Sequence, residues 1–216
     1  MYRALIGTAS SELFNASTDQ KLYRCLLRQL LHSPLTDSVT PLSPSLDETI
    51  LKNFGSNPKF RRINGDVDSS VDLPSALFLL TGESEEGLPK NARLDHICMI
   101  SSIFRKFPRP REERFLDLLR ENNPGARISV FRISRVLGDQ GTSWFDSDVM
   151  MDKAYEVGSQ FLPAKYREIS ANHLAQAMRL NYETCTPNFK EGDGSENVEL
   201  LSFVDCMKIL GLEERI

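Results

Sequence analysis

The 216-residue sequence contains few of the features that mark specialised classes of protein. No apolar run approaches the roughly 20 residues that a membrane-spanning helix needs. The first residues, Met1 to Gly7, contain no long apolar region, so no signal peptide is expected. The cysteines form no C-x-x-C pair and show no zinc-type spacing, which favours reduced thiols in a cell interior over a disulfide framework or a metal site. There are four of them: Cys25, Cys98, Cys185 and Cys206.

The chain also lacks an excess of positive charge. Its 26 Lys and Arg stand against 30 Asp and Glu, a net charge of −4, so the chain as a whole is not an obvious nucleic-acid binder. Charge balance does not exclude a local basic cluster. One is present, with five members: Arg105, Lys106, Arg109, Arg111 and Arg114. We expect this basic cluster either to be solvated or to bind an anionic partner, which would be RNA phosphate or an acidic protein surface.

The most informative segment that is present is a short apolar run, Ile97 to Ile100, followed by Ser101 and Ser102. A short apolar run bounded by polar residues predicts a strand that is buried on both faces. In open α/β sheets, ligands bind just beyond the carboxyl ends of such strands. We therefore expect the two serines to lie at the binding edge of a sheet.

Similar runs recur along the chain and alternate with amphipathic segments. Besides 97–100, strands are expected at residues 3–7, 39–42, 59–67, 76–80, 126–137, 166–169 and 198–202. Helices are expected from residue 17 or 18 through the leucines up to 31, at 46–54, 112–122 and 149–157, from 170 or 172 to 182, and after 202 through 210. This alternation predicts an α/β protein with a doubly wound, mostly parallel sheet and helices on both faces. We expect one domain, with the sheet core up to about residue 140 and a C-terminal extension, residues 141–216, packed on the strand ends.

Six short segments also occur in a particular order. They are Ala4–Gly7, Gly65–Asp68, Leu80–Gly82, Ile100–Ser102, Val130–Arg132, and Tyr166–Ile169 continuing through Leu174–Ala177. Over nearly the whole chain this series resembles an atypical short-chain dehydrogenase/reductase, close to the oxidoreductase-like proteins related to the Tat-interacting protein. The resemblance rests on the order of the segments, because no single one is specific. It implies a Rossmann fold and an NAD or NADP site at Gly7, Thr8, Ser10, Asp66, Gly82 and Ser101.

The cofactor loop departs from that family. A dinucleotide site needs glycines where the backbone approaches the pyrophosphate. Counted from Gly7, the expected spacing falls on Ser10 and Leu13 instead of glycines. Ser43 stands where an acid or an arginine would contact the ribose. We therefore favour an ordinary loop that is not built to bind phosphate, and expect no cofactor unless the pocket is still open.

The catalytic pair is replaced as well. The family uses the tyrosine and lysine of Y-x-x-x-K to move a proton, and the matching spacing here is Phe107-x-x-x-Arg111. Phenylalanine has no proton to give, and arginine is effectively never deprotonated. Ser102, or Ser101, would be the relic of the family serine or an ordinary strand-end cap. No other catalytic group replaces the pair, because structural roles are expected for all three histidines: His32, His96 and His173.

Two classes of function remain. We expect a catalytically degenerate dehydrogenase-like protein that acts as a structural or accessory subunit of a larger assembly. The resemblance implies protein partners and favours the mitochondrion over the cytoplasm. The alternative is an NAD(P)-dependent oxidoreductase in which Ser102 and Arg111 have unusual roles, or a nucleotide-binding sensor. A bound nucleotide would favour the alternative, whereas a large buried interface around residues 105–114 would favour the accessory subunit.

Overall fold

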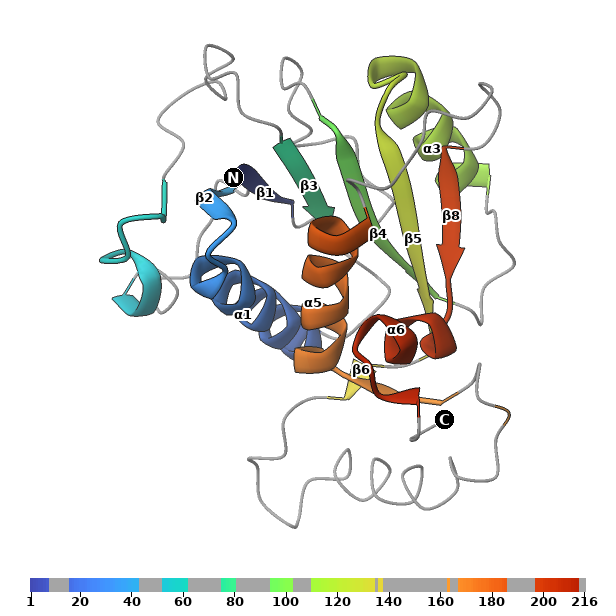
Figure 1. Ribbon diagram of the computed structural model, residues 1–216. Helices are drawn as coiled ribbons and strands as arrows, with labels where there is room; N and C mark the ends of the chain where they lie inside the picture. The colour runs from blue at the N-terminus through green and yellow to red at the C-terminus, as the bar shows by residue number, and fades with distance from the viewer. Residues whose placement is uncertain are drawn as a thin grey trace.

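The computed structural model describes residues 1–7, 16–42, 52–61, 75–80, 94–102, 110–134, 136–137, 163, 167–185 and 197–213. These residues build a six-stranded sheet with helices on both faces (Figure 1). Its strands are β1 (Tyr2–Gly7), β2 (Thr36–Pro41), β3 (Ser75–Leu79), β4 (His96–Ser102), β5 (Arg127–Ile133) and β8 (Val198–Leu201). They lie in the order β2-β1-β3-β4-β5-β8, and every neighbouring pair is parallel. The predicted parallel sheet is therefore confirmed.

The direction in which strands are added to the sheet reverses at β1. The chain first places β2 on one side of β1, and later places β3, β4 and β5 successively on the other side. Phe60 continues the first side beyond β2 through an isolated parallel bridge to Val39. This is the arrangement of a doubly wound, Rossmann-like sheet. In such sheets the ligand crevice lies outside the carboxyl ends of the strands at the reversal point, which here is between β1 and β3.

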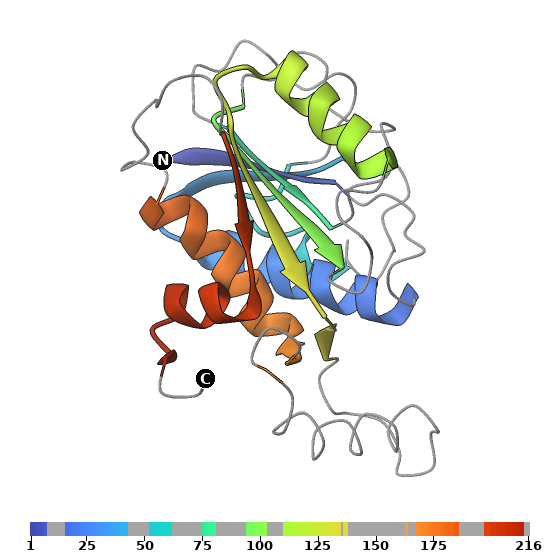
Figure 2. The ribbon, with the colours of Figure 1, turned by 90° about the vertical axis from the view of Figure 1, so that its right-hand side faces the viewer.

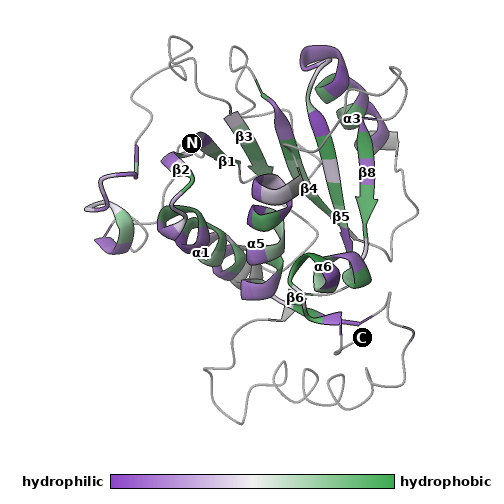
Figure 3. Ribbon diagram, viewed as in Figure 1, coloured by the Kyte–Doolittle hydropathy of each residue, from purple (hydrophilic) through white to green (hydrophobic). Residues whose placement is uncertain are grey.

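The helices cover the two faces of the sheet unequally. Figure 2 shows α1 (Ala16–His32), α5 (Ala171–Leu180) and α6 (Phe203–Ile209) on one face, and α3 (Pro110–Asn122) on the other. Because successive strand residues point to opposite faces, Ile6 and Phe78 join the core under α1, whereas Leu5 and Leu77 join the core under α3. Strands β1 and β3 are accordingly apolar along most of their length, and the helices carry one polar face (Figure 3). Of the helices described, none is long and apolar enough to cross a membrane.

Helix α1 follows the predicted leucine stripe closely. Its five leucines are all buried: Leu22, Leu26, Leu27, Leu30 and Leu31. The helix ends at His32, before Pro34, which cannot continue it. The predicted cap at Ser17 or Thr18 is wrong, because α1 already begins at Ala16 and both residues lie in its first turn. At α5 the cap is found as expected, since the Ser170 side chain accepts a hydrogen bond from the backbone N–H of His173 at 3.1 Å.

The single strand predicted over residues 126–137 is in fact two strands. After β5 the chain turns at Ser134, whose hydroxyl donates to the backbone oxygen of Arg167 at 2.6 Å. The short strand β6 (Val136–Leu137) then pairs in parallel with β7 (Ile169–Ser170) in a separate two-stranded sheet. The hydrophobic pattern ran through this turn, because residues on either side of it are buried in the same core.

Three other predictions concern segments that lie partly or wholly outside the described residues. Of the strand predicted at 59–67, the structure describes 59–61, where Phe60 forms the bridge to Val39. Of the helix predicted at 46–54, residues 52–54 are helical. The helix predicted at 149–157 lies outside the described residues. After about residue 140, the chain contributes the edge strand β8 to the main sheet as well as helices α5 and α6 on one face.

Candidate functional site

The carboxyl edge of the sheet is where the predicted cofactor site lies. Gly7 ends β1, and Ser101 and Ser102 end β4, so the parallel strands bring these three positions to the same edge. Ser101 is fully buried there. The remaining predicted cofactor residues lie outside the part of the chain that the structure describes: Thr8, Ser10, Asp66 and Gly82.

Gly7 stands at the reversal point itself, and leucine side chains lie closest to it. It pairs in register with Leu79 of β3. A Cβ atom added to Gly7 would come within 2.6 Å of Leu79 Cδ2 and within 3.9 Å of Leu42 Cδ1. The space left by the missing side chain is therefore used by a leucine of the neighbouring strand. Packing accounts for this glycine, and the one polar atom near that space is the backbone oxygen of Phe78 at 4.0 Å, which cannot donate a hydrogen bond to a phosphate.

We expect Gly7→Ala to lower the free energy of unfolding by about 1–3 kcal/mol, the usual cost of overpacking a filled core. Leu79 is only 5% exposed and has little room to move aside. Chemical denaturation measures the loss. Shortening Leu79 to alanine in the Gly7→Ala background should cost less than it does in the wild type, because the new methyl group fills part of the space. Gly125→Ala is the matched control, since a Cβ at that position meets nothing within 4 Å.

The predicted catalytic relics are not assembled into a site by the described residues. Phe107 lies outside them. Arg111 lies in the first turn of α3, where the structure describes its backbone and not its side chain. Of the basic cluster, Arg114 is exposed on α3, and Arg105, Lys106 and Arg109 lie outside the described ranges. Ser102 is placed at the end of β4, and nothing is described of its side chain.

Three of the five tyrosines are described, and none of the three stands at the carboxyl edge. Tyr2 begins β1, Tyr23 lies within α1, and Tyr182 follows α5. Burial is the largest cause in each case and raises the pKa of all three phenols above the usual range. A tyrosine that exchanges protons near neutral pH needs a lowered pKa. None of these three therefore substitutes for the family tyrosine.

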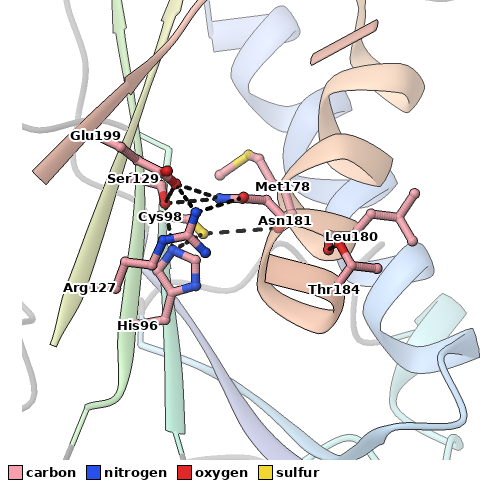
Figure 4. Close-up of polar contacts among 9 residues, drawn as sticks. All are labelled: His96, Cys98, Arg127, Ser129, Met178, Leu180, Asn181, Thr184 and Glu199. Atoms are coloured by element: carbon pink, nitrogen blue, oxygen red, sulfur yellow. Dashed lines mark hydrogen bonds and ion pairs between the residues drawn. The ribbon is translucent and has the colours of Figure 1, made fainter. Parts of the chain in front are cut away.

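Within the part of the chain that the structure describes, a dense group of polar side chains lies at the opposite, amino-terminal edge of the sheet (Figure 4). Side chains from β4, β5, β8 and the residue after α5 converge beneath α5: His96, Cys98, Arg127, Ser129, Asn181 and Glu199. All except Glu199 are buried, and the Glu199 side chain is 32% exposed. Sequence reasoning placed His96 at a strand start and missed the other members of this polar network.

Ser129 is the centre of the polar network. Its hydroxyl donates to a carboxylate oxygen of Glu199 and accepts from Asn181 Nδ2 at 2.9 Å. His96 Nε2 lies 2.6 Å from the same hydroxyl oxygen. Because a hydroxyl has one hydrogen, which goes to Glu199, His96 Nε2 must carry the hydrogen of its own contact. Ser129 is therefore fully engaged, and neither its hydroxyl nor His96 is arranged for nucleophilic attack.

Charge in the polar network is balanced by one ion pair. Arg127 Nη2 donates to Glu199 Oε1 at 2.5 Å and to Asn181 Oδ1 at 3.3 Å. Burial, together with the positive charge of Arg127, lowers the pKa of His96 to about 3, so its ring is neutral at physiological pH. Cys98 Sγ lies 3.6 Å from His96 Nε2. A neutral imidazole gives this buried thiol no positive charge that would favour a thiolate. The arrangement stabilises strands and does not resemble an active site.

A sequence signal for the polar network did exist. On β5 the polar residues Arg127 and Ser129 alternate with the apolar Ile128 and Val130, and this period of two sends both polar side chains to one face.

Among the described residues no group of three or more His, Cys, Asp and Glu side chains could hold a metal ion.

No protein-family model matches the chain, and no curated protein matches it. Solved structures do resemble it. A short-chain dehydrogenase/reductase-family oxidoreductase from Burkholderia thailandensis aligns with a TM-score of 0.49 at 11% identity, over 93% of this chain and 90% of the other. The reductase domain of an aureusimine biosynthetic cluster aligns with a TM-score of 0.46 at 9% identity, over 93% and 67%. A double mutant of a dTDP-glucose 4,6-dehydratase from Streptomyces venezuelae, with NAD and DAU bound, aligns with a TM-score of 0.42 at 11% identity, over 98% and 82%.

Proposed function

We propose that this protein is a non-catalytic protein built on the frame of an NAD(P)-binding Rossmann fold, serving as a structural or accessory subunit of a larger assembly. The observation that carries the proposal is the packing of Leu79 against Gly7 at the reversal point of the sheet. At this point a dinucleotide site depends on close approach of backbone and phosphate. Here the glycine serves the packing of two strands.

The distribution of polar groups supports the same proposal. At the amino-terminal edge the buried His96 and the carboxylate of Glu199 both contact the hydroxyl of Ser129, which also accepts from Asn181. In the sequence, Phe107 and Arg111 stand in place of the tyrosine and the lysine of the family pair. For partners we propose protein subunits, with the basic cluster as the contact for an acidic surface and RNA phosphate as a further possible anion.

A second candidate is a protein that still binds NAD or NADP, either as an oxidoreductase with an unusual site or as a nucleotide sensor. One observation favours it, namely that Gly7, Ser101 and Ser102 lie at the same edge of a sheet whose strand order reverses beside Gly7. In this candidate the backbone at Gly7 and the Ser101 position would hold the cofactor, and the cofactor would supply the hydride chemistry.

Thermal unfolding of the purified chain with and without millimolar NADH and NADPH separates the two candidates. A ligand that binds only the folded state adds roughly 2.7 kcal/mol at a hundredfold excess over its Kd and must raise the midpoint. We expect no shift with either cofactor. A clear shift overturns the non-binding proposal. Oxidation of the reduced cofactor by a carbonyl substrate would then identify an oxidoreductase, and binding without turnover a sensor.

The accessory-subunit role has an independent readout. In gently lysed native cells, size-exclusion chromatography should find the protein well above the 24.4 kDa of the single chain. The purified chain, run on the same column, is the reference. Elution of the native protein at the position of the purified chain would contradict the role, whatever the outcome with nucleotides.

A further inference from the structure

A single π-helical turn, Asn181–Cys185, continues α5 and reaches both halves of the amino-terminal edge of the sheet. Such turns are rare and arise where an extra residue is accommodated in an α-helix, frequently at functional positions. Here the consecutive residues Asn181, Tyr182 and Glu183 contact different parts of the sheet. This π-turn therefore lies at a junction between elements that are far apart in the sequence.

Asn181 is the arm of the π-turn that reaches β5 and β8 (Figure 4). It is 1% exposed, and its amide is used in both directions. The oxygen accepts from Arg127, while the nitrogen donates to Ser129 and, at 3.2 Å, to Glu199 of β8. Strand β8 is short, with four register pairs to β5, and Asn181 and Arg127 add side-chain contacts to its Glu199.

Glu183 is the arm that reaches the other half of the edge. Its carboxylate accepts from the phenol of Tyr2 on β1 at 3.2 Å and from the hydroxyl of Ser33, just after α1. Arg179, one turn earlier, donates to the second oxygen at 2.9 Å. The Glu183 side chain is 6% exposed, so these donors replace the water that the carboxylate gave up.

Tyr182 fills the space between the two arms. Its ring centroid lies 4.2 Å from that of Tyr2 and 5.6 Å from that of His96. The three residues thus contact β1, β4, β5 and β8, four of the six strands. In a regular α-helix successive side chains differ by about 100° around the axis. Removing the extra residue would rotate the later side chains relative to Asn181, and one arm would lose its partners.

We propose that the π-turn is a two-armed clasp, a conformational device that joins the two halves of the sheet at its amino-terminal edge. The Asn181 arm holds β8, and with it the following α6, against β5. The Glu183 arm holds β1 and the end of α1 against α5. Loss of the contacts of one arm exposes the elements held by that arm and leaves those held by the other arm protected. This inference concerns the amino-terminal edge and is independent of whether the carboxyl edge binds a nucleotide.

Native-state hydrogen exchange of the full chain, read by mass spectrometry, tests the clasp. In Asn181→Ala we expect exchange over residues 198–209 to speed up by on the order of tenfold, because buried donors and acceptors lose their partner. Exchange over residues 2–7 should change much less. In Glu183→Ala the pattern should reverse, with faster exchange over residues 2–7 and around residue 33, and little change over residues 198–209.

Asn172→Ala is the matched control, because Asn172 is exposed at the start of the same helix and its side chain contacts Gln29 at the surface. It should leave both regions unchanged. If the alanine variants fold poorly, Asn181→Ser and Glu183→Gln supply milder versions of the same two changes. Equal acceleration of both regions in either variant would overturn the clasp, since it would indicate one global opening. Unchanged exchange in both variants would overturn it as well.

Discussion

Replacing Glu199 by alanine is expected to lower the free energy of unfolding by about 3 kcal/mol. The substitution leaves the guanidinium of Arg127 buried, with its side chain 7% exposed, and without the carboxylate 2.5 Å away. Removing one partner of a buried ion pair typically costs roughly 3–5 kcal/mol. The 32% exposure of the Glu199 side chain lets water compensate in part, which places the expectation at the lower end of that range. Urea unfolding monitored by circular dichroism measures the change.

The chain contains a matched control for this experiment. Arg120 and Asp117 form an ion pair on α3 whose side chains are 48% and 56% exposed. Asp117→Ala should cost under about 1 kcal/mol, because exposed pairs contribute little. The double variant Arg127→Met with Glu199→Leu should be more stable than Glu199→Ala alone, since it removes the buried charge together with its partner. A loss at Glu199 no larger than that at Asp117 would show that the polar network does not hold β8.

Stability should fall steeply in acid because of His96. The pKa of this residue is about 3 in the folded protein, lowered first by burial and then by Arg127, against an ordinary value of 6.5. The unfolded chain therefore takes up a proton below about pH 6.5, whereas the folded protein does not until about pH 3. The stabilisation is complete above pH 6.5 and is lost as pH falls through this window. Its slope is at most about 1.4 kcal/mol per pH unit.

The variant His96→Gln isolates this contribution from that of the carboxylates. Glutamine does not titrate, and its side-chain NH₂ can donate to Ser129 in place of the imidazole Nε2, which lies 2.6 Å from that hydroxyl oxygen. Denaturant unfolding at a series of pH values from 7 to 4 should show the wild type losing stability faster than the variant. Parallel pH profiles for the two proteins would mean that His96 is protonated equally in both states, which its complete burial argues against.

Much of the fold could be read from local pattern. The apolar runs of β1, β3 and β4, the alternating start of β5, the leucine stripe of α1 and the Ser170 cap of α5 all depend on neighbours in the sequence. Their alternation was enough to predict a doubly wound parallel sheet. Local pattern did less well where the backbone turned without a change of polarity, as at Ser134, and it placed the start of α1 one or two residues after Ala16, where the helix begins.

The roles of individual residues could be assigned only from the tertiary structure. Gly7 matches the first glycine of a phosphate loop in the sequence, yet the register of β1 with β3 places Leu79 against it, and that register depends on the whole sheet. The polar network was missed because its members are far apart in the chain. His96 and Ser129 are 33 positions apart, and Arg127 and Glu199 are 72 positions apart.

Sequence pattern alone thus determined most of the described strands and helices and the faces they bury, since burial of apolar surface is a property of each segment and its period. Tertiary structure alone decided which polar groups are paired. A hydrogen bond depends on tenths of an ångström and on direction, and such geometry arises only when parallel strands have taken their register and α5 has docked across them.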